Sequence, residues 1–379
     1  MDAATSGRSW RRAVGALAVA AVLALASASA PAATTYTHGG WCKAGSSAAW
    51  RRTLSHHVTA VSKTTAMVPL ALAHDGRSFF AEVYSPRFSG VARVESRTSA
   101  VMRIKAFPDP KFDQAWGAFD GRWLVWNEYH GFDSFDDFTT WAWDSRTRKL
   151  TQIGAATRGP NGQFWESPWR GADVRRGIAT WVQGVGPDEL GEVHSYNLQS
   201  GRDLVVRHGH PGGGFLLDHH LVVWTEASAR GVPTRMHTAS ALTGRPVSLP
   251  RALRGLRNVT GLQTDGHRIG YPDARYKSLW WAPALGAKPH EVVGTRHLDH
   301  VDNSVSVGGR YVGFGLFPDV YVADTKTRRY IEVSTNGGSA FVDSRTLLVV
   351  HGPRRKVLHA ILRMALVPLR DLPPIPACR

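Results

Sequence analysis

The segment from Asn127 to Thr139 gathers the side chains of this sequence that are best suited to hold a ligand. It contributes four carboxylates and one imidazole, from Glu128, His130, Asp133, Asp136 and Asp137, with four aromatic residues standing between them. Carboxylates are the hard oxygen ligands that Ca²⁺ prefers, and aromatic rings can pack against the faces of sugars. The spacing fits no EF-hand loop, so the competing interpretation is a solvated loop anchored by its phenylalanines.

A second polar group lies near residue 300, where imidazole and carboxylate side chains alternate. Its members are His297, Asp299, His300 and Asp302. Such a group could bind a divalent transition metal or act as an acid–base pair. The sequence holds 17 histidines, so a chance cluster is the competing interpretation.

Neither group completes a catalytic or cofactor motif, and the sequence contains no Gly-x-Ser-x-Gly nucleophile elbow. We therefore expect a binding or scaffold protein rather than an enzyme, with Ca²⁺ as the candidate cofactor. The alternative is a carbohydrate-active hydrolase or lyase that uses Glu128, Asp133 and Asp299. Glycoside hydrolysis needs paired carboxylates about 5 to 10 Å apart.

Both groups fall between copies of a repeated element, a turn pair followed by an apolar or aromatic strand. The copies start near Asp75, Asp120, Arg175, Asp218, Asp265, Gly308 and Asp343. The seventh residue of each copy is apolar or aromatic: Ala81, Trp126, Trp181, Trp224, Tyr271, Phe314 and Val349. A period of about 40 to 50 residues is typical of one four-stranded propeller blade.

The repeats predict an all-β fold, a β-propeller of seven four-stranded blades over residues 67–372, with six or eight blades as alternatives. In the second blade we expect strands over 115–119, 122–126, 140–143 and 148–153. Asp-Gly between apolar runs is a strong hairpin signal. The loops between second and third strands open on one face of such a ring, so the Asn127–Thr139 segment would stand at the mouth of its channel.

These repeats resemble the blades of TolB-like and prolyl-oligopeptidase-like propellers. The likeness rests on the Asp120-Gly121 turn after the inner strand, on Trp126 in the second strand, and on the late turn Asp144-Ser145-Arg146-Thr147. It covers residues 67–372 and implies the propeller fold. The sequence ends at Arg379 without an α/β-hydrolase domain, so the resemblance does not imply peptidase chemistry.

The first 32 residues read as a secretory signal peptide. Arg8, Arg11 and Arg12 precede an apolar run over 13–26, and small residues then lead to a cleavage site after Ala32. The run is shorter than the roughly 20 residues that cross a bilayer. We expect a secreted protein without a membrane span, exported by the general or the twin-arginine route.

The two cysteines, Cys42 and Cys378, stand at opposite ends of the mature chain. A propeller brings its first and last blades together, and an exported protein can keep a disulfide there, so we expect these cysteines to be bonded. We expect residues 33–66 to form a lead-in segment, as a short helix over 46–57 or as a strand that closes the ring. Residues 373–379 would form a tail.

The chain is strongly basic. Loss of three arginines and Asp2 with the leader lowers the formal charge from +16 to +14. Such a field favours anionic partners, so we expect an extracellular polysaccharide, an anionic wall polymer or a protein as the partner of a monomer. No nucleic-acid-binding module is visible, so specific nucleic-acid recognition is not expected.

Overall fold

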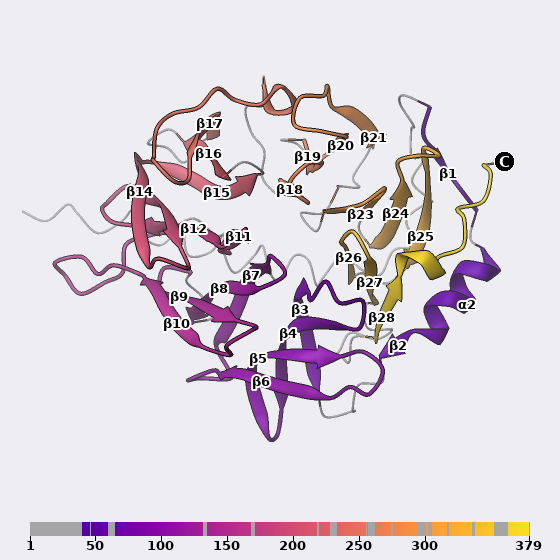
Figure 1. Cartoon of the computed structure of the whole chain (residues 1–379), viewed down its shortest axis with the longest axis horizontal. Coiled ribbons are helices and arrows are strands. Elements are labelled where there is room, and N and C mark those ends of the chain that lie inside the picture. The colour runs from indigo at the N-terminus through magenta and orange to yellow at the C-terminus, as the bar shows by residue number, and fades with distance from the viewer. Residues whose placement is uncertain are drawn as a thin grey trace, which may run out of the picture.

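The computed structural model describes residues 40–378 apart from 46, 60–64, 132–134, 168–170, 218–219, 228–232, 255, 257–261, 274–275, 295–300, 302–304, 317, 336–337 and 352–362. Seven antiparallel sheets follow one another around a ring in chain order (Figure 1). The chain is thus a seven-bladed β-propeller, which confirms the predicted fold.

The blades are numbered in chain order, and within each blade the strands run from the channel outward. Blades 1 to 3 comprise β3 (Ala66–Leu72), β4 (Ser78–Ser85), β5 (Phe88–Glu95) and β6 (Val101–Ala106); β7 (Asp113–Phe119), β8 (Trp123–His130), β9 (Phe138–Asp144) and β10 (Leu150–Ala155); and β11 (Asp173–Arg175), β12 (Ile178–Gly184), β13 (Gly191–Asn197) and β14 (Arg202–Gly209). Blades 4 and 5 comprise β15 (Pro211–Leu217), β16 (Leu221–Ala227) and β17 (Pro233–Ser240); and β18 (Gln263–Thr264), β19 (Ile269–Pro272), β20 (Ser278–Ala282) and β21 (His290–Gly294). Blades 6 and 7 comprise β22 (Ser306–Gly308), β23 (Tyr311–Leu316), β24 (Asp319–Asp324) and β25 (Arg329–Ser334); and β26 (Gly338–Val342), β27 (Thr346–His351) and β28 (Arg363–Pro368).

The outer edge of blade 4 is the least regular. Beyond β17 the described chain shows one isolated bridge, between Ala239 and Pro246, and two backbone hydrogen bonds, from the Val247 amide to the Thr238 carbonyl and from the Ser240 amide to the Arg245 carbonyl. Short 3₁₀ turns at Arg251–Leu253 and Leu369–Asp371 follow blades 4 and 7.

The repeated turn aspartate holds the hairpin between the first two strands of a blade. One oxygen of Asp120 accepts the amide hydrogens of Arg122 and Trp123, at 2.9 and 2.8 Å. The same pair of bonds recurs at Asp75, Asp265 and Asp343. Aspartate is favoured at such turns because its short carboxylate reaches the backbone two residues on.

The core of the protein lies between the blades. A cluster of buried apolar side chains fills each of the seven seams, where a seam is the contact between two consecutive blades. All seven residues at the repeated strand position are buried in these clusters. The period of the sequence therefore follows from the need of every blade to bury both faces.

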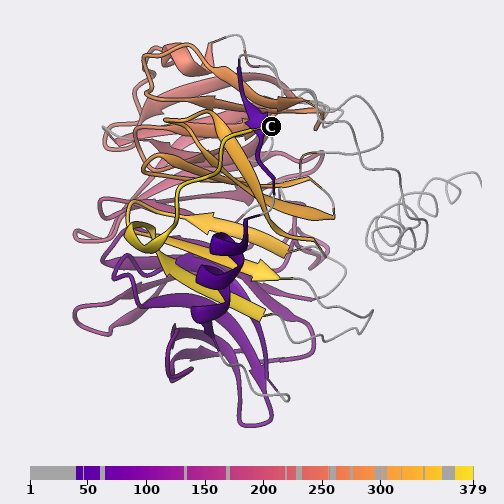
Figure 2. The same cartoon turned by 90° about the vertical axis from the view of Figure 1, so that its right-hand side faces the viewer.

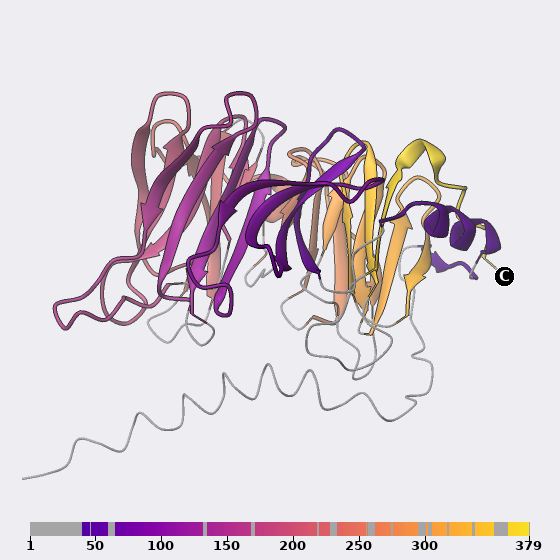
Figure 3. The ribbon, with the colours of Figure 1, turned by 90° about the horizontal axis from the view of Figure 1, so that it is seen from below.

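The N-terminal segment closes the ring on its outside. β2 (Val58–Thr59) pairs antiparallel with β28 as the fourth strand of blade 7, and β1 (Cys42–Lys43) pairs parallel with β25 of blade 6. Between them α2 (Ala48–His56) packs Trp50 and Leu54 onto the seam of blades 6 and 7. Figures 2 and 3 show α2 beside β28 on the outer side of the ring.

Cys42 and Cys378 form a disulfide with a Cα–Cα distance of 6.2 Å. It joins β1 to the last described residues of the chain. The signal-peptide prediction falls on residues outside the described part. Within that part, no helix is both long and apolar enough to cross a membrane.

Candidate functional site

Three polar side chains converge where β7 begins and β8 ends. In the register of this strand pair Asp113 lies opposite His130, and Ala115 lies opposite Glu128. Because side chains alternate along a strand, Asp113, Glu128 and His130 all share the face that bears Trp126. That face packs on blade 1, so the three groups stand in the seam of blades 1 and 2.

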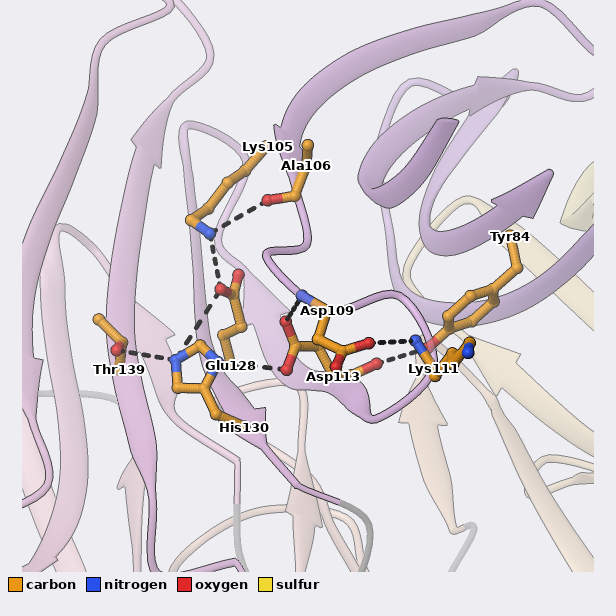
Figure 4. A network of polar contacts seen from close by, with 9 residues as sticks. All are labelled: Tyr84, Lys105, Ala106, Asp109, Lys111, Asp113, Glu128, His130 and Thr139. Carbon is orange, nitrogen blue, oxygen red and sulfur yellow. Dashed lines mark hydrogen bonds and ion pairs between the residues drawn. The ribbon is translucent and has the colours of Figure 1, made fainter. Parts of the chain in front are cut away.

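His130 interacts with each of the other two groups (Figure 4). His130 Nδ1 lies 3.3 Å from Asp113 Oδ1, and His130 Nε2 lies 3.0 Å from the Thr139 hydroxyl and 4.0 Å from Glu128 Oε1. The other Asp113 oxygen accepts the Asp109 amide hydrogen at 2.8 Å. The imidazole is therefore fixed from both sides.

Lys105, near the end of β6 in blade 1, reaches across the seam to Glu128. Its Nζ lies 2.6 Å from Glu128 Oε1 and 3.2 Å from the Ala106 carbonyl oxygen, and 4.8 Å above the centre of the Trp141 ring. Glu128 is fully buried, and its second oxygen makes no hydrogen bond within the described chain. We call Lys105, Asp113, Glu128 and His130 the seam cluster.

Part of this cluster belongs to the blade repeat. Glu226 of blade 4 pairs with Arg207 from the outer strand of blade 3 at 3.0 Å. Gln183 of blade 3 donates to Thr157, which follows the outer strand of blade 2, at 2.6 Å. A link from the second strand of one blade to the outer edge of the preceding blade is thus a recurring structural device.

The imidazole is what sets blade 2 apart. His130 stands two residues after Glu128, whereas valine and serine stand two residues after Gln183 and Glu226, at Val185 and Ser228. A position that departs from its own repeat is a better candidate for function than one that follows it, because a fold carries its function in grafted sites.

Burial shapes the electrostatics of this seam. It raises the pKa of Glu128, although the Lys105 ion pair and His130 oppose the shift. The neighbouring Glu82 of β4 is also buried, which raises its pKa to about 7 against the hydrogen bonds from the Tyr84 hydroxyl and the Ala115 amide. The seam thus holds three buried carboxylates, Glu82, Asp113 and Glu128, and only Glu128 contacts the Lys105 ammonium group within the described chain.

The cluster meets part of what a metal site requires. One ligand atom from each of Asp113, Glu128 and His130 lies within 4.8 Å of the other two. However, both imidazole nitrogens face protein partners, and Lys105 occupies Glu128 Oε1. A cation at Oε1 would have to displace that ammonium, so the residues fit a hydrogen-bonding site better than a Ca²⁺ or transition-metal site.

Three aromatic residues of the same segment, Tyr129, Phe135 and Phe138, lie on the opposite face of blade 2, toward blade 3. Tyr129 and Phe138 are buried there, and Phe135 contacts Tyr129 and Trp116, each with a ring-centre distance of 5.0 Å. Trp116 of β7 is 37% exposed and Phe112, directly before β7, is 49% exposed. The start of β7 thus separates polar groups on one side from ring faces on the other.

The structure brings together two of the predicted site residues, Glu128 and His130. Asp137 is close, since its carbonyl accepts the His130 amide hydrogen at 2.9 Å, and burial raises the pKa of its carboxyl. Asp136 turns away and accepts the Ser167 amide hydrogen at 3.1 Å. The remaining predicted residues lie outside the described part of the chain: Asp133, His297, Asp299, His300 and Asp302.

Sequence reasoning missed Asp113, Lys105 and Glu82. It placed residues 127–139 in a loop, whereas β8 continues to His130 and β9 begins at Phe138. A register count contained the missing signal for Asp113: Phe119 pairs with Leu124 across the Asp120 turn, and six more steps bring Asp113 opposite His130. Lys105 belongs to another blade, and no local pattern points to it.

No protein-family model matches this chain, and no curated protein matches it either. Among solved structures, oligogalacturonate lyase from Vibrio parahaemolyticus superposes with a TM-score of 0.51 at 9% identity, over 82% of this chain and 92% of that one. A prolyl endopeptidase gives 0.51 at 15% identity, over 84% of this chain and 48% of that one. TolB from Acinetobacter baumannii gives 0.39 at 11% identity, over 80% and 63%.

These likenesses show the fold alone. The chain spans about half the length of the endopeptidase, and what it shares with that protein is the propeller architecture. A shared propeller does not transfer an activity, because function resides in the site and not in the fold.

Proposed function

We propose that this protein is a secreted, non-catalytic propeller that binds an extracellular glycan or cell-wall polymer at the start of β7. One observation carries the proposal: the polar groups that depart from the repeat and the exposed aromatic rings flank the same short stretch. A sugar chain laid across the edge of β7 would meet the partly exposed His130, which the buried Asp113 holds in place, on one side. It would meet Trp116 on the other side, and Phe112 is exposed directly before the strand.

This mixture is what ligand sites use. A few fixed polar groups set orientation, and apolar or aromatic surface provides most of the contact area. His130 is held by Asp113 and Thr139, so it would lose little conformational entropy on binding. The formal charge of +14 that remains without the leader favours an anionic polymer over a neutral one.

Export is supported by the basic and apolar leader and by the Cys42–Cys378 disulfide, since such bonds persist in oxidising compartments. Membership in the TolB-like propellers, which the repeats suggest, belongs to the same proposal. A protein partner in place of a polymer is an outcome of the test below.

The pairing of the carboxylates favours binding over catalysis. Asp113 is held by His130 and by a backbone amide, and one oxygen of Glu128 is held by Lys105. A general base needs a lone pair within reach of its substrate, and Glu128 is fully buried. The hydrolase or lyase alternative is favoured by a different fact: burial raises the pKa of Glu128 beside an imidazole, an arrangement suited to a general acid.

The test uses tag-free protein from residue 33 onward, incubated with polygalacturonate, with neutral dextran and with bacterial cell walls. Bound protein and released reducing or unsaturated sugar ends are measured in the same sample. We expect binding to the anionic polymers without product, and at least a tenfold loss of affinity in Trp116→Ala and His130→Gln, in line with about 1.4 kcal/mol or more per contact. Glu226→Gln, which alters the corresponding link in blade 4, is the matched control and should bind normally.

Product release that disappears in Glu128→Gln would replace this proposal with the enzyme alternative. A protein that binds none of the polymers, while it remains folded by circular dichroism, would reject glycan recognition and direct the search to protein partners.

A further inference from the structure

A second cluster of imidazole and carboxylate groups lies on the outer half of blade 3, and shares no residue with the seam cluster. It consists of Glu192, His194, Asp203 and His208, from strands β13 and β14. We call it the blade 3 cluster. Nothing in the proposed binding function uses it.

The sheet places these side chains on one face. Glu192 and His194 are two residues apart on β13, and His208 of β14 lies opposite Glu192. His194 stacks on Trp181 with a ring-centre distance of 4.9 Å and an angle of 5° between the rings. The His194 side chain is 8% exposed, so its ring is held in place by packing.

The hydrogen bonds of His194 define which nitrogen is free. Nδ1 lies 3.0 Å from Asp203 Oδ2, and because a carboxylate only accepts, Nδ1 carries the hydrogen. In the neutral ring Nε2 then keeps its lone pair. Nε2 is buried and makes no hydrogen bond within the described chain, although Glu192 Oε2 stands 3.5 Å away.

Two electron-rich atoms that face each other in this way are stabilised by a positive charge between them, which is either a proton on Nε2 or a metal ion. An imidazole that donates one N–H to a carboxylate and turns its other nitrogen toward further ligands is the usual arrangement of a metal-binding histidine. Tetrahedral Zn²⁺ with bonds of about 2.1 Å places its ligand atoms about 3.4 Å apart. His194 Nε2 lies 3.5 Å from Glu192 Oε2, and His208 Nδ1 lies 3.3 Å from the other oxygen, Glu192 Oε1, so each imidazole faces its own oxygen of the carboxylate at a distance close to that value.

We propose that the blade 3 cluster binds one divalent transition-metal ion of the Zn²⁺ class through His194 Nε2, Glu192 and His208. Asp203 orients His194 and does not touch the metal. The His208 side chain is 57% exposed, so it is free to turn its imidazole onto the ion, and water completes the coordination. Two imidazoles with one carboxylate select Zn²⁺, Cu²⁺, Ni²⁺ or Co²⁺ over Ca²⁺ and Mg²⁺, which prefer oxygen ligands alone.

Blade 4 supplies a matched control. His237 stacks on Trp224 as His194 stacks on Trp181, with a ring-centre distance of 5.6 Å. Its Nε2, however, accepts a hydrogen bond from Arg235 Nε at 3.1 Å. Arg235 stands two residues before His237, where Glu192 stands before His194 in the blade 3 cluster. The guanidinium would repel a metal ion, so His237 should bind none.

The test is calorimetric titration of metal-free, tag-free mature protein with ZnCl₂, together with the visible absorption of the Co²⁺ form. We expect one ion per chain and the intense absorption of tetrahedral Co²⁺. His208→Asn and Glu192→Gln should weaken binding at least tenfold, and Asp203→Asn should weaken it about 10- to 100-fold, as orienting carboxylates do. His237→Asn should bind as the unaltered protein does.

Asp113→Asn separates this proposal from metal binding at the seam cluster. If Asp113→Asn abolishes Zn²⁺ binding and His208→Asn does not, the ion sits at the seam and the proposal is overturned. The proposal is equally overturned if the unaltered protein binds Zn²⁺ only in the millimolar range. Because His208 is exposed, its variant should fold even if the buried His194→Gln does not.

Discussion

Lys105 Nζ lies 2.6 Å from Glu128 Oε1 across the seam of blades 1 and 2, and both side chains are shielded from water. The same link joins Arg207 to Glu226 between blades 3 and 4 at 3.0 Å, but there the Arg207 side chain is 46% exposed. The ion pair between neighbouring blades is therefore buried in one case and exposed in the other. A buried charge that loses its partner costs far more than an exposed one, so the two links should respond differently to truncation.

Lys105→Met should lower the free energy of unfolding by about 3 to 5 kcal/mol at pH 7, because it leaves Glu128 buried without its counter-charge. The measurement is urea denaturation followed by tryptophan fluorescence. Since the methionine stem fills the same space, the loss reports the charge and not a cavity.

Arg207→Met is the control for this prediction and should cost less than about 1 kcal/mol, as exposed ion pairs do. The double variant Lys105→Met with Glu128→Gln should recover most of the lost stability. Equal losses in the two single variants would show that burial does not decide the strength of these links.

The free energy of unfolding that Glu82 contributes should decrease as the pH rises from about 5 to 7. Its ordinary pKa is 4.5 and burial raises it to about 7 in the folded state, so the folded protein binds this proton more tightly than the unfolded chain. The contribution of Glu82 to stability is thus greatest below pH 4.5, falls through this window, and levels off above pH 7. The difference in pKa corresponds to about 3 kcal/mol.

Glu82→Gln lacks this titration, so the stability of the unaltered protein relative to the variant should decline between about pH 5 and 7.5. Urea denaturation at several pH values measures it. Glu95→Gln is the control, because hydrogen bonds from the Thr98 and Arg97 amides lower the pKa of Glu95, and its effect should not fall with rising pH. A constant difference between Glu82→Gln and the unaltered protein would count against this account.

The parts of the fold that the sequence predicted are those that local chemistry determines. Asp120 could be predicted as a turn residue because it begins an Asp-Gly pair. In the structure its carboxylate bonds to the amides two and three residues on. Trp126 was identified as a blade position because every blade must bury an equivalent side chain. Both signals repeat along the chain, so they favoured seven blades, with six and eight as alternatives.

Only part of the candidate site could be predicted, because its polar side chains find their hydrogen-bond and ion-pair partners far away in the sequence. Glu128 and His130 read as loop residues, since charged side chains rarely lie in a buried strand without partners. Their partners are Lys105, 23 residues away in another blade, and Asp113, 17 residues away across the hairpin. Single-sequence patterns do not show such pairings.

Gly308→Ala should destabilise the protein by about 1 to 3 kcal/mol, the usual range for overpacking. A Cβ at this position would lie 2.4 Å from backbone atoms of Asp343, so the turns of blades 6 and 7 would have to separate. Gly286→Ala is the matched control, because nothing lies within 4 Å of its Cβ position. Thermal unfolding of both variants measures the difference, and equal melting temperatures would contradict the close approach of these two turns.

Breaking the Cys42–Cys378 bond should weaken the closure of the ring more than it weakens any single blade. The bond closes a loop with a sequence separation of 336 residues, for which the chain-entropy model gives about 6 kcal/mol as an upper value. It also fastens β1 against β25, and through α2 it fastens β2 against β28. We therefore expect Cys42→Ser with Cys378→Ser to lower the unfolding midpoint and to speed amide exchange in residues 47–59 before other segments.

A reducing agent should reproduce this effect in the unaltered protein and leave the double variant unchanged. Faster exchange spread evenly over all seven blades would mean that the bond stabilises the whole ring and does not act as a local fastening of its N-terminal segment.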